Sequence, residues 1–103
     1  MTYQIAWVQP NFQQGPREFN AFYLPYSAGV IWSYACTDAW VRDNFECTGM
    51  VWRRDDVETV AQGLKHNHVV AFSTYVWNHQ YNYAVARRLR ELAPDCVIIF
   101  GGP

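Results

Sequence analysis

Short segments that are apolar along their whole length constrain the fold of this chain more than any other feature. His68–Ser73 (HVVAFS) and Cys96–Phe100 (CVIIF) are β-branched and apolar, without alternation of polar residues. Strands of this kind are buried on both faces, which requires a covering layer on each side of the sheet. Gln4–Gln9 (QIAWVQ) and Cys47–Trp52 (CTGMVW) also fit strands. The sequence therefore predicts four strands in a sheet that is covered on both faces.

Stretches with apolar residues at helical spacing separate these strand candidates. We expect a first helix from Pro25 to about Arg42, a second that begins with the capping box of Asp55 and Glu58, and a third that is capped by Asn78. Alternating strands and helices predict a parallel sheet, because each helix returns the chain to the same end of the sheet. The expected fold is α/β: a three-layer, flavodoxin-like or Rossmann-like βαβαβαβ arrangement with the strand order 2-1-3-4.

With 103 residues, the chain has room for one domain, which we assign to residues 1–103. The fourth expected strand runs directly into Gly101-Gly102-Pro103, where the sequence stops. Domains of this architecture usually add a further helix and often a fifth strand. We therefore expect a sheet that is incomplete at the carboxyl end, and a chain that forms the front part of a longer protein.

Charge and cysteine usage narrow the class of protein. The net charge of −1 argues against binding to nucleic acid or to an anionic membrane surface, and no apolar run approaches the length of a membrane span. Cys36, Cys47 and Cys96 form neither a disulfide framework nor a CxxC motif. These features predict a cytoplasmic protein. The five Trp, seven Tyr and six Phe exceed what a small core needs, so some rings are expected to face a ligand or partner.

Candidate ligand-binding residues follow the first, third and fourth expected strands. In open α/β sheets, ligands bind beyond the carboxyl ends of the strands, close to the point where the strand order reverses. There, hydroxyls and amides can make polar contacts, an aromatic ring gives a flat surface, and glycines let the backbone approach a ligand. The alternative is that the glycines only form a turn and that the aromatic rings only pack against other side chains of the protein. The candidates are Gln9, Asn11, Ser73, Thr74, Tyr75, Gly101 and Gly102.

The sequence gives weaker support to a metal site, a dinucleotide site, a phosphorelay receiver or a hydrolase site. His66 and His68, with His79 further on, lack the carboxylate or cysteine neighbours expected of a metal site, and we assign no metal ligand. The first loop has neither the GxGxxG pattern of a dinucleotide site nor the acidic residues of a phosphorelay receiver. Ser73 lacks the GxSxG motif of hydrolases, and the arginines at positions 87, 88 and 90 fit a solvated helix face.

Three segments resemble the amino-terminal cobalamin-binding domain of cobalamin-dependent radical S-adenosylmethionine (SAM) enzymes. They are Leu24–Gly29 (LPYSAG), Val69–Asn78 (VVAFSTYVWN) and Ile98–Pro103 (IIFGGP), and the resemblance covers most of the chain. Cobalamin domains generally carry a Ser-x-Leu motif after the third strand and a glycine pair after the fourth. Ser73-Thr74-Tyr75 and Gly101-Gly102 stand in these places, with Tyr75 where leucine is usual.

The resemblance implies that the nucleotide tail of cobalamin inserts beside the third and fourth strands, against Ser73, Thr74 and the glycine pair. The DxHxxG motif, whose histidine ligates cobalt, is absent, and no histidine precedes His66. We therefore expect cobalamin to bind without a protein histidine on cobalt. The CxxxCxxC motif of radical SAM enzymes is also absent, so the iron–sulfur cluster and SAM are expected only in a missing downstream domain. The chain alone is not expected to be catalytic.

Two functional hypotheses follow. In the first, the chain is a metal-binding module in the sense that it holds the cobalt cofactor cobalamin, for methyl transfer or related radical chemistry carried out with a downstream radical SAM domain. In the second, it is a degenerate scaffold or interaction domain that keeps the fold without the cofactor. A cleft filled by Tyr75 or Trp77 would favour the second. An uncovered sheet edge and aromatic face would also allow homo-oligomers.

Overall fold

Four parallel strands form the central sheet, in a computed structural model that describes residues 2–11, 13–14, 21–22 and 24–102. Their order across the sheet is β4-β1-β5-β6. In chain order this is 2-1-3-4, so the expected α/β fold and strand order are confirmed. The elements are β1 (Tyr3–Val8), β2 (Gln13–Gln14), β3 (Ala21–Phe22), α1 (Tyr26–Ala35), α2 (Ala39–Asn44), β4 (Phe45–Val51), α3 (Val57–Leu64), β5 (Val69–Ser73), α4 (His79–Leu92) and β6 (Val97–Gly101).

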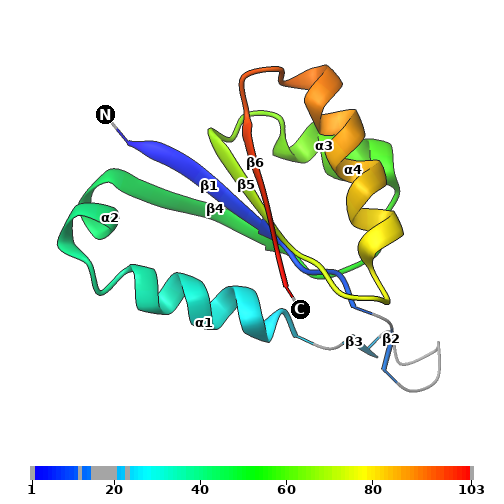
Figure 1. Ribbon diagram of the computed structural model, residues 1–103, viewed down its shortest axis with the longest axis horizontal. Coiled ribbons are helices and arrows are strands. Elements are labelled where there is room, and N and C mark those ends of the chain that lie inside the picture. Colours follow the sequence, from blue (N-terminus) through cyan, green and yellow to red (C-terminus); the bar gives the residue numbers. More distant parts are fainter. Residues whose placement is uncertain (1, 12, 15–20, 23, 103) are drawn as a thin grey trace.

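Helices lie on both faces of the sheet, as Figure 1 shows: α3 and α4 on one side and α1 on the other. Along each strand, successive side chains point alternately toward one helix layer and toward the other. Ala6 and Val8 of β1 belong to the core cluster under α3 and α4, whereas Ile5 and Trp7 turn toward α1 and line a cavity there. The three-layer arrangement expected from the apolar strands is therefore present.

The tightly packed core lies between the sheet and the pair α3 and α4. It consists of apolar side chains whose spacing on α3 and α4 follows the helical period. Val8, Val70, Val85 and Leu89 are completely inaccessible to solvent, which makes this side of the sheet the main source of hydrophobic stabilisation. The full cluster is Ala6, Val8, Val60, Leu64, Val70, Phe72, Val85, Ala86, Leu89 and Cys96.

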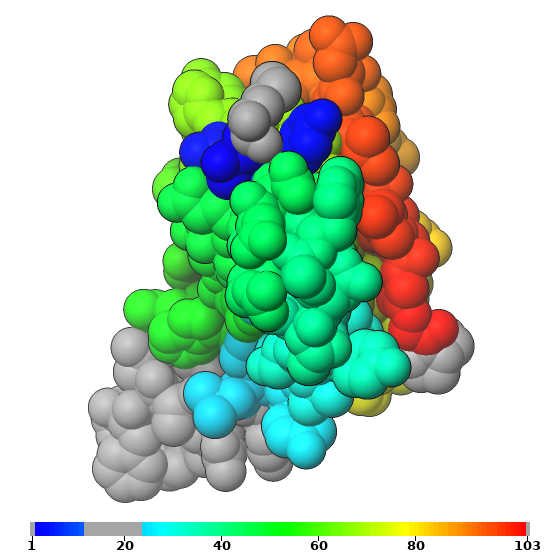
Figure 2. Space-filling view, turned by 90° about the vertical axis from the view of Figure 1, so that its left-hand side faces the viewer, coloured from blue at the N-terminus to red at the C-terminus, as the bar shows by residue number. Residues whose placement is uncertain are grey.

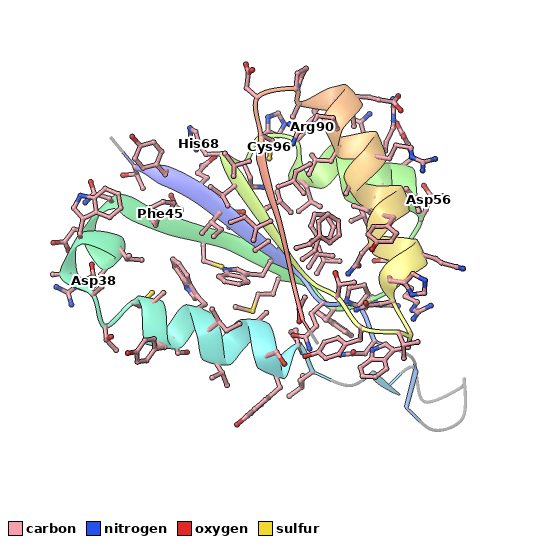
Figure 3. The ribbon with its side chains drawn as sticks, viewed as in Figure 1. Asp38, Phe45, Asp56, His68, Arg90 and Cys96 are labelled. Carbon is pink, nitrogen blue, oxygen red and sulfur yellow. The ribbon has the colours of Figure 1, made fainter. Side chains whose placement is uncertain are left out.

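The segment between β1 and β4 differs from expectation in two ways. The single helix predicted from Pro25 to about Arg42 is wrong, because the chain leaves the helix at Cys36 and starts again at Ala39. The Asp38 carboxylate accepts hydrogen bonds from the backbone of Trp40 and Val41, at 3.0 and 3.1 Å, and so starts a new helix (Figure 3). The loop predicted after β1 also contains a short antiparallel pair, β2 with β3. Gly15 and Pro16 of that loop lie outside the described residues.

Two predicted helix caps are also corrected. The α3 cap is Asp56 rather than Asp55, and its carboxylate accepts a hydrogen bond from the Thr59 backbone at 3.1 Å. Asn78 precedes α4, as predicted, but its side chain does not cap that helix. Instead, its Oδ1 accepts a hydrogen bond from the Tyr75 backbone at 2.7 Å. No helix within the described residues is long and apolar enough to cross a membrane.

Strand β6 forms one edge of the sheet and is only partly covered. Val97 and Ile99 remain 54% and 48% exposed although they are apolar strand residues. In the space-filling view, the red residues of β6 form a continuous strip of surface beside the cyan and green residues of α1 and α2 (Figure 2). This part of the α1 side of the sheet is an exposed apolar face.

An exposed ion pair joins the two helices of the main core. Arg88 of α4 donates to Glu58 of α3, with Nε to Oε2 at 2.6 Å and Nη2 to Oε1 at 3.0 Å. Hydrogen bonds from Arg88 and then from Gln62 lower the pKa of Glu58 from 4.5 to about 2. The ionised carboxylate is therefore favoured in the folded state.

The ion pair between Arg88 and Glu58 predicts that the free energy of unfolding falls in acid. Because the folded pKa of Glu58 lies below its unfolded value, the stabilisation is present above about pH 5 and is lost as the pH falls toward 2. Glu58→Gln should make the urea unfolding midpoint less dependent on pH between 5 and 2. Glu46→Gln, at an exposed position in β4, is the control and should leave the slope as in the unmodified chain. An unchanged slope in Glu58→Gln would contradict this assignment.

Candidate functional site

A cavity of about 490 Å³ lies between α1 and the sheet, toward the carboxyl ends of the strands. Its apolar wall is formed by side chains of β1, β5, β6 and α1, and polar groups of Ser27, Ser73 and Tyr75 line it as well. No charged side chain of the described residues lines it. The cavity therefore suits an uncharged, mostly apolar ligand group that makes a few hydrogen bonds. The lining residues are Ile5, Trp7, Ser27, Ala28, Ile31, Ala71, Phe72, Ser73, Tyr75, Ile99, Gly101 and Gly102.

Four of the seven candidate residues line this cavity: Ser73, Tyr75, Gly101 and Gly102. They come together because β5 and β6 are neighbouring parallel strands, with Ser73 paired opposite Gly101. The Thr74 backbone N–H then donates to the Gly101 carbonyl oxygen at 2.7 Å, which joins the two loops just beyond the strands. The structure thus brings the candidate loops to one place, while their contacts with a ligand stay a prediction.

The other three candidates hold the surrounding structure through their side chains. Gln9 Oε1 accepts a hydrogen bond from the Ala28 backbone at 2.9 Å, in the first turn of α1. Asn11 Oδ1 accepts from the indole of Trp77 at 3.1 Å. Thr74 Oγ1 accepts from Asn82 of α4 at 3.1 Å, on the side away from α1. These contacts position α1 and the loop after β5, and none of the three residues is part of the cavity lining.

Asn78 connects the loops after β1 and β5. Its side chain is only 1% exposed, and its Nδ2 donates to the carbonyl oxygens of Pro10 and Ser73 at 3.0 and 3.1 Å. The sequence pattern predicts this residue only as a helix cap. A buried amide that bonds to backbone groups 68 and 5 residues away cannot be recognised from local spacing.

Ser27 is a site residue that sequence analysis did not single out. It lies in the first turn of α1 and lines the cavity. Its hydroxyl oxygen lies 2.6 Å from the Tyr75 hydroxyl, which links α1 to the loop after β5. The LPYSAG run that contributed to the family resemblance contains this serine, so that run was the available signal.

The two glycines after β6 have different structural roles. Gly102 has a φ of +130°, and a Cβ built there would lie 2.0 Å from the Thr74 carbonyl oxygen, so the loop accepts no other residue without rearrangement. A Cβ at Gly101 would meet no atom within 4 Å. Since Ile99 lines the cavity and side chains alternate along a strand, a side chain at position 101 would point into the same space.

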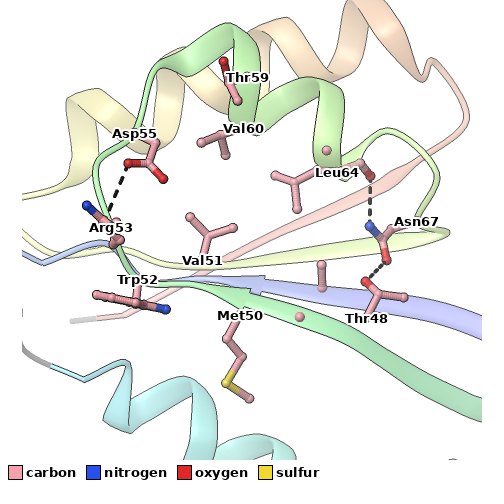
Figure 4. A pocket seen from close by; sticks show the side chains of 13 residues that line it. Thr48, Met50, Val51, Trp52, Arg53, Asp55, Thr59, Val60, Leu64 and Asn67 are labelled. Atoms are coloured by element: carbon pink, nitrogen blue, oxygen red, sulfur yellow. Dashed lines mark hydrogen bonds and ion pairs between the residues drawn. The ribbon is translucent and has the colours of Figure 1, made fainter.

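A second cavity, of about 370 Å³, lies on the opposite face of the sheet, between β4 and α3 (Figure 4). Several of its polar groups contact one another or the backbone. Thr48 donates to Asn67 Oδ1 at 2.6 Å, Asn67 Nδ2 donates to the Leu64 carbonyl oxygen at 3.0 Å, and Arg53 lies 3.9 Å from Asp55. These groups therefore stabilise the contact of α3 with the sheet, and this cavity contains none of the candidate residues.

Comparison with known proteins gives two relatives. The first is a 2-(S-pantetheinyl)-carbapenam-3-carboxylate methyltransferase of Streptantibioticus cattleyicolor, 35% identical over 81 residues. The second is the cobalamin-dependent radical SAM methyltransferase TokK of Streptomyces tokunonensis, 31% identical over 81 residues. Each match covers 79% of this chain but only 12% of the relative. No protein-family profile matches the chain. The resemblance to cobalamin-dependent radical SAM enzymes, first suggested by three short segments, is confirmed.

The geometry of the glycine pair predicts a structural requirement at position 102. Gly102→Ala places a methyl group against the Thr74 carbonyl oxygen and forces a side chain onto a positive φ, so the variant should lose about 2 kcal/mol or more of unfolding free energy. Urea denaturation followed by circular dichroism measures this. Gly63→Ala is the matched control, because its Cβ meets no atom within 4 Å and alanine favours the helix. Equal stability of the two variants would refute the assigned loop geometry.

Proposed function

We propose that this chain, a relative of cobalamin-dependent radical SAM methyltransferases over 79% of its length, is a cobalamin-binding module. The observation that carries the proposal is the uncharged cavity between α1 and the sheet, lined by Ser73, Tyr75, Gly101 and Gly102. In an open parallel sheet this is the region where a ligand is expected. The residues that line the cavity would hold the nucleotide tail of the cofactor.

The cavity meets the physical requirements of such a tail. Its volume of about 490 Å³ falls within the roughly 300–1,000 Å³ typical of small-molecule sites. Ile5, Ile31 and Ile99 offer apolar surface to a flat aromatic base, and the hydroxyl-bearing residues Ser27, Ser73 and Tyr75 provide hydrogen-bonding groups. Tyr75 lies in the wall and Trp77 is outside the lining, so neither ring closes the cavity as the degenerate-scaffold hypothesis requires.

The residues of this chain have distinct roles in the proposed site. Gln9 fixes the first turn of α1, Asn11 fixes Trp77, and Thr74 is held by Asn82. Ser73 supplies a polar contact, and Gly101 leaves space for the ligand because it lacks a side chain. When bound, cobalamin supplies a cobalt atom that can carry a methyl group. Since no histidine precedes His66 in the sequence, the proposed binding mode has no protein histidine on cobalt.

The activity of the whole protein is a further part of the proposal. The chain spans 12% of the length of the relatives it matches, and it lacks the CxxxCxxC motif of a radical SAM cluster. We propose that a radical SAM domain, which binds the iron–sulfur cluster and SAM, is its partner in methyl transfer in the cytoplasm. The exposed Val97 and Ile99 on β6 offer an apolar surface for that domain or for a second copy of the chain.

The first test is binding of hydroxocobalamin and methylcobalamin to this chain. Gel filtration after mixing should give a protein peak that retains the cofactor, with the visible spectrum of a cobalamin whose own base has left cobalt and has not been replaced by histidine. Absence of retained colour at cofactor concentrations up to the millimolar range would contradict the proposed function.

Gly101→Val should abolish this binding, because the branched side chain fills the cavity at the position where the backbone now leaves space. The fold should survive, since a Cβ at position 101 meets no atom within 4 Å and valine suits a strand. Gly49→Val in β4 is the matched control, because it lines the second cavity and also meets no atom within 4 Å. His68→Ala should also bind normally. Equal loss in all three variants would overturn the site assignment.

A further inference from the structure

Tyr75 occupies the position where cobalamin domains usually have leucine, and its surroundings give it a defined orientation. Its ring stacks on Trp77, with ring centres 4.6 Å apart and planes 3° apart. Trp77 is itself fixed by the hydrogen bond from its indole to Asn11. The Tyr75 backbone N–H donates to the buried Asn78. The tyrosine is thus held from the loop side by two neighbours, Trp77 and Asn78, and Trp77 is in turn held by Asn11.

The Tyr75 ring both stacks on a neighbouring ring and belongs to a residue that lines the cavity. One face is covered by Trp77, which does not line the cavity, whereas Tyr75 itself does. Ser27, which also lines the cavity, holds the far end of the ring through the 2.6 Å contact between the hydroxyls. A ring that is fixed at both ends, and covered on the loop side, presents rigid aromatic surface to the cavity. Such a surface binds flat aromatic rings by stacking.

The hydroxyl pair adds a polar function. Either of the two hydroxyls can donate to the other, and the one that accepts keeps its own proton. One O–H donor at this end of the cavity is therefore available to an acceptor on a ligand. No charged side chain of the described residues competes for that acceptor within the lining.

From these contacts we infer that Tyr75 is the specificity-determining residue of the cavity: it stacks on the flat aromatic base of the nucleotide tail and, with Ser27, donates one hydrogen bond to it. This inference rests on the proposed function and deepens it, because it identifies the base as the group that the cavity recognises. A leucine at this position could pack against a base but could neither stack as an aromatic ring nor form the hydroxyl pair.

The test compares Tyr75→Leu, Tyr75→Phe and the unmodified chain against three probes: cobalamin, cobinamide, which lacks the nucleotide tail, and free 5,6-dimethylbenzimidazole. Affinities are measured by calorimetry and by tryptophan fluorescence. Tyr75→Leu should lose roughly ten- to hundredfold in affinity for cobalamin and for the free base, with no change toward cobinamide. Tyr75→Phe should keep most of the affinity because stacking remains. Tyr34→Leu, at an exposed position of α1, is the control variant.

The outcomes separate this inference from the proposed function. If the unmodified chain binds cobalamin but Tyr75→Leu binds it equally well, the inference is wrong and the function stands. If the chain binds no corrinoid but binds the free base in a Tyr75-dependent way, the proposed function is wrong, and only the part of the inference that assigns recognition of an aromatic base to Tyr75 stands. Equal losses toward cobalamin and cobinamide would also overturn the inference, because they would show a general effect on the fold. Thermal unfolding of each variant identifies such an effect directly.

Discussion

The buried side chain of Asn78 is the interaction on which the cavity and its surroundings depend. Its amide nitrogen donates to the carbonyl oxygens of Pro10, in the loop after β1, and of Ser73, the last residue of β5, and its amide oxygen accepts from the Tyr75 backbone. The Asn78 side chain makes all three hydrogen bonds, and Asn78 is only 1% exposed. Loss of one partner in such a setting leaves the others buried without compensation, at a cost of roughly 1–3 kcal/mol each. The carboxyl edge of the sheet is therefore a rigid unit that precedes any ligand.

The sheet could be predicted from the sequence because its strands depend on local patterns. The continuous apolar runs in β5 and β6 require burial on both faces, and the helical period of Val60, Leu64, Val85 and Leu89 supplies the layer above them. Once the elements alternate, the handedness of the crossovers and the burial of the two central strands leave few topologies. The order β4-β1-β5-β6 follows from these constraints.

The break between α1 and α2 and the cap at Asp56 could not be predicted in the same way. Asp38 and Asp56 each compete for nearby backbone N–H groups, and the helical period of the apolar residues continues across position 38 without a signal. The site shows the same limit. The glycine pair and Ser73 could be predicted as candidates because they stand at the carboxyl ends of predicted strands, whereas Ser27 lines the cavity only because α1 packs over the sheet.

The two faces of the sheet use their side chains for different purposes. On the α3 and α4 side, β-branched and aliphatic residues form the dense core, in which Val8 and Leu89 are fully buried, and the second cavity of about 370 Å³ lies beside this core, between β4 and α3. On the α1 side, Ala28 is the buried residue of a helix whose other apolar residues leave about 490 Å³ beside Ile5, Ala71 and Ile99. Ile31 and Ile99 beside this space are 53% and 48% exposed, so the α1 side of the sheet buries less apolar surface than the α3 and α4 side. The dense core on the α3 and α4 side is therefore the main source of stability in a fold that keeps a cavity beside α1.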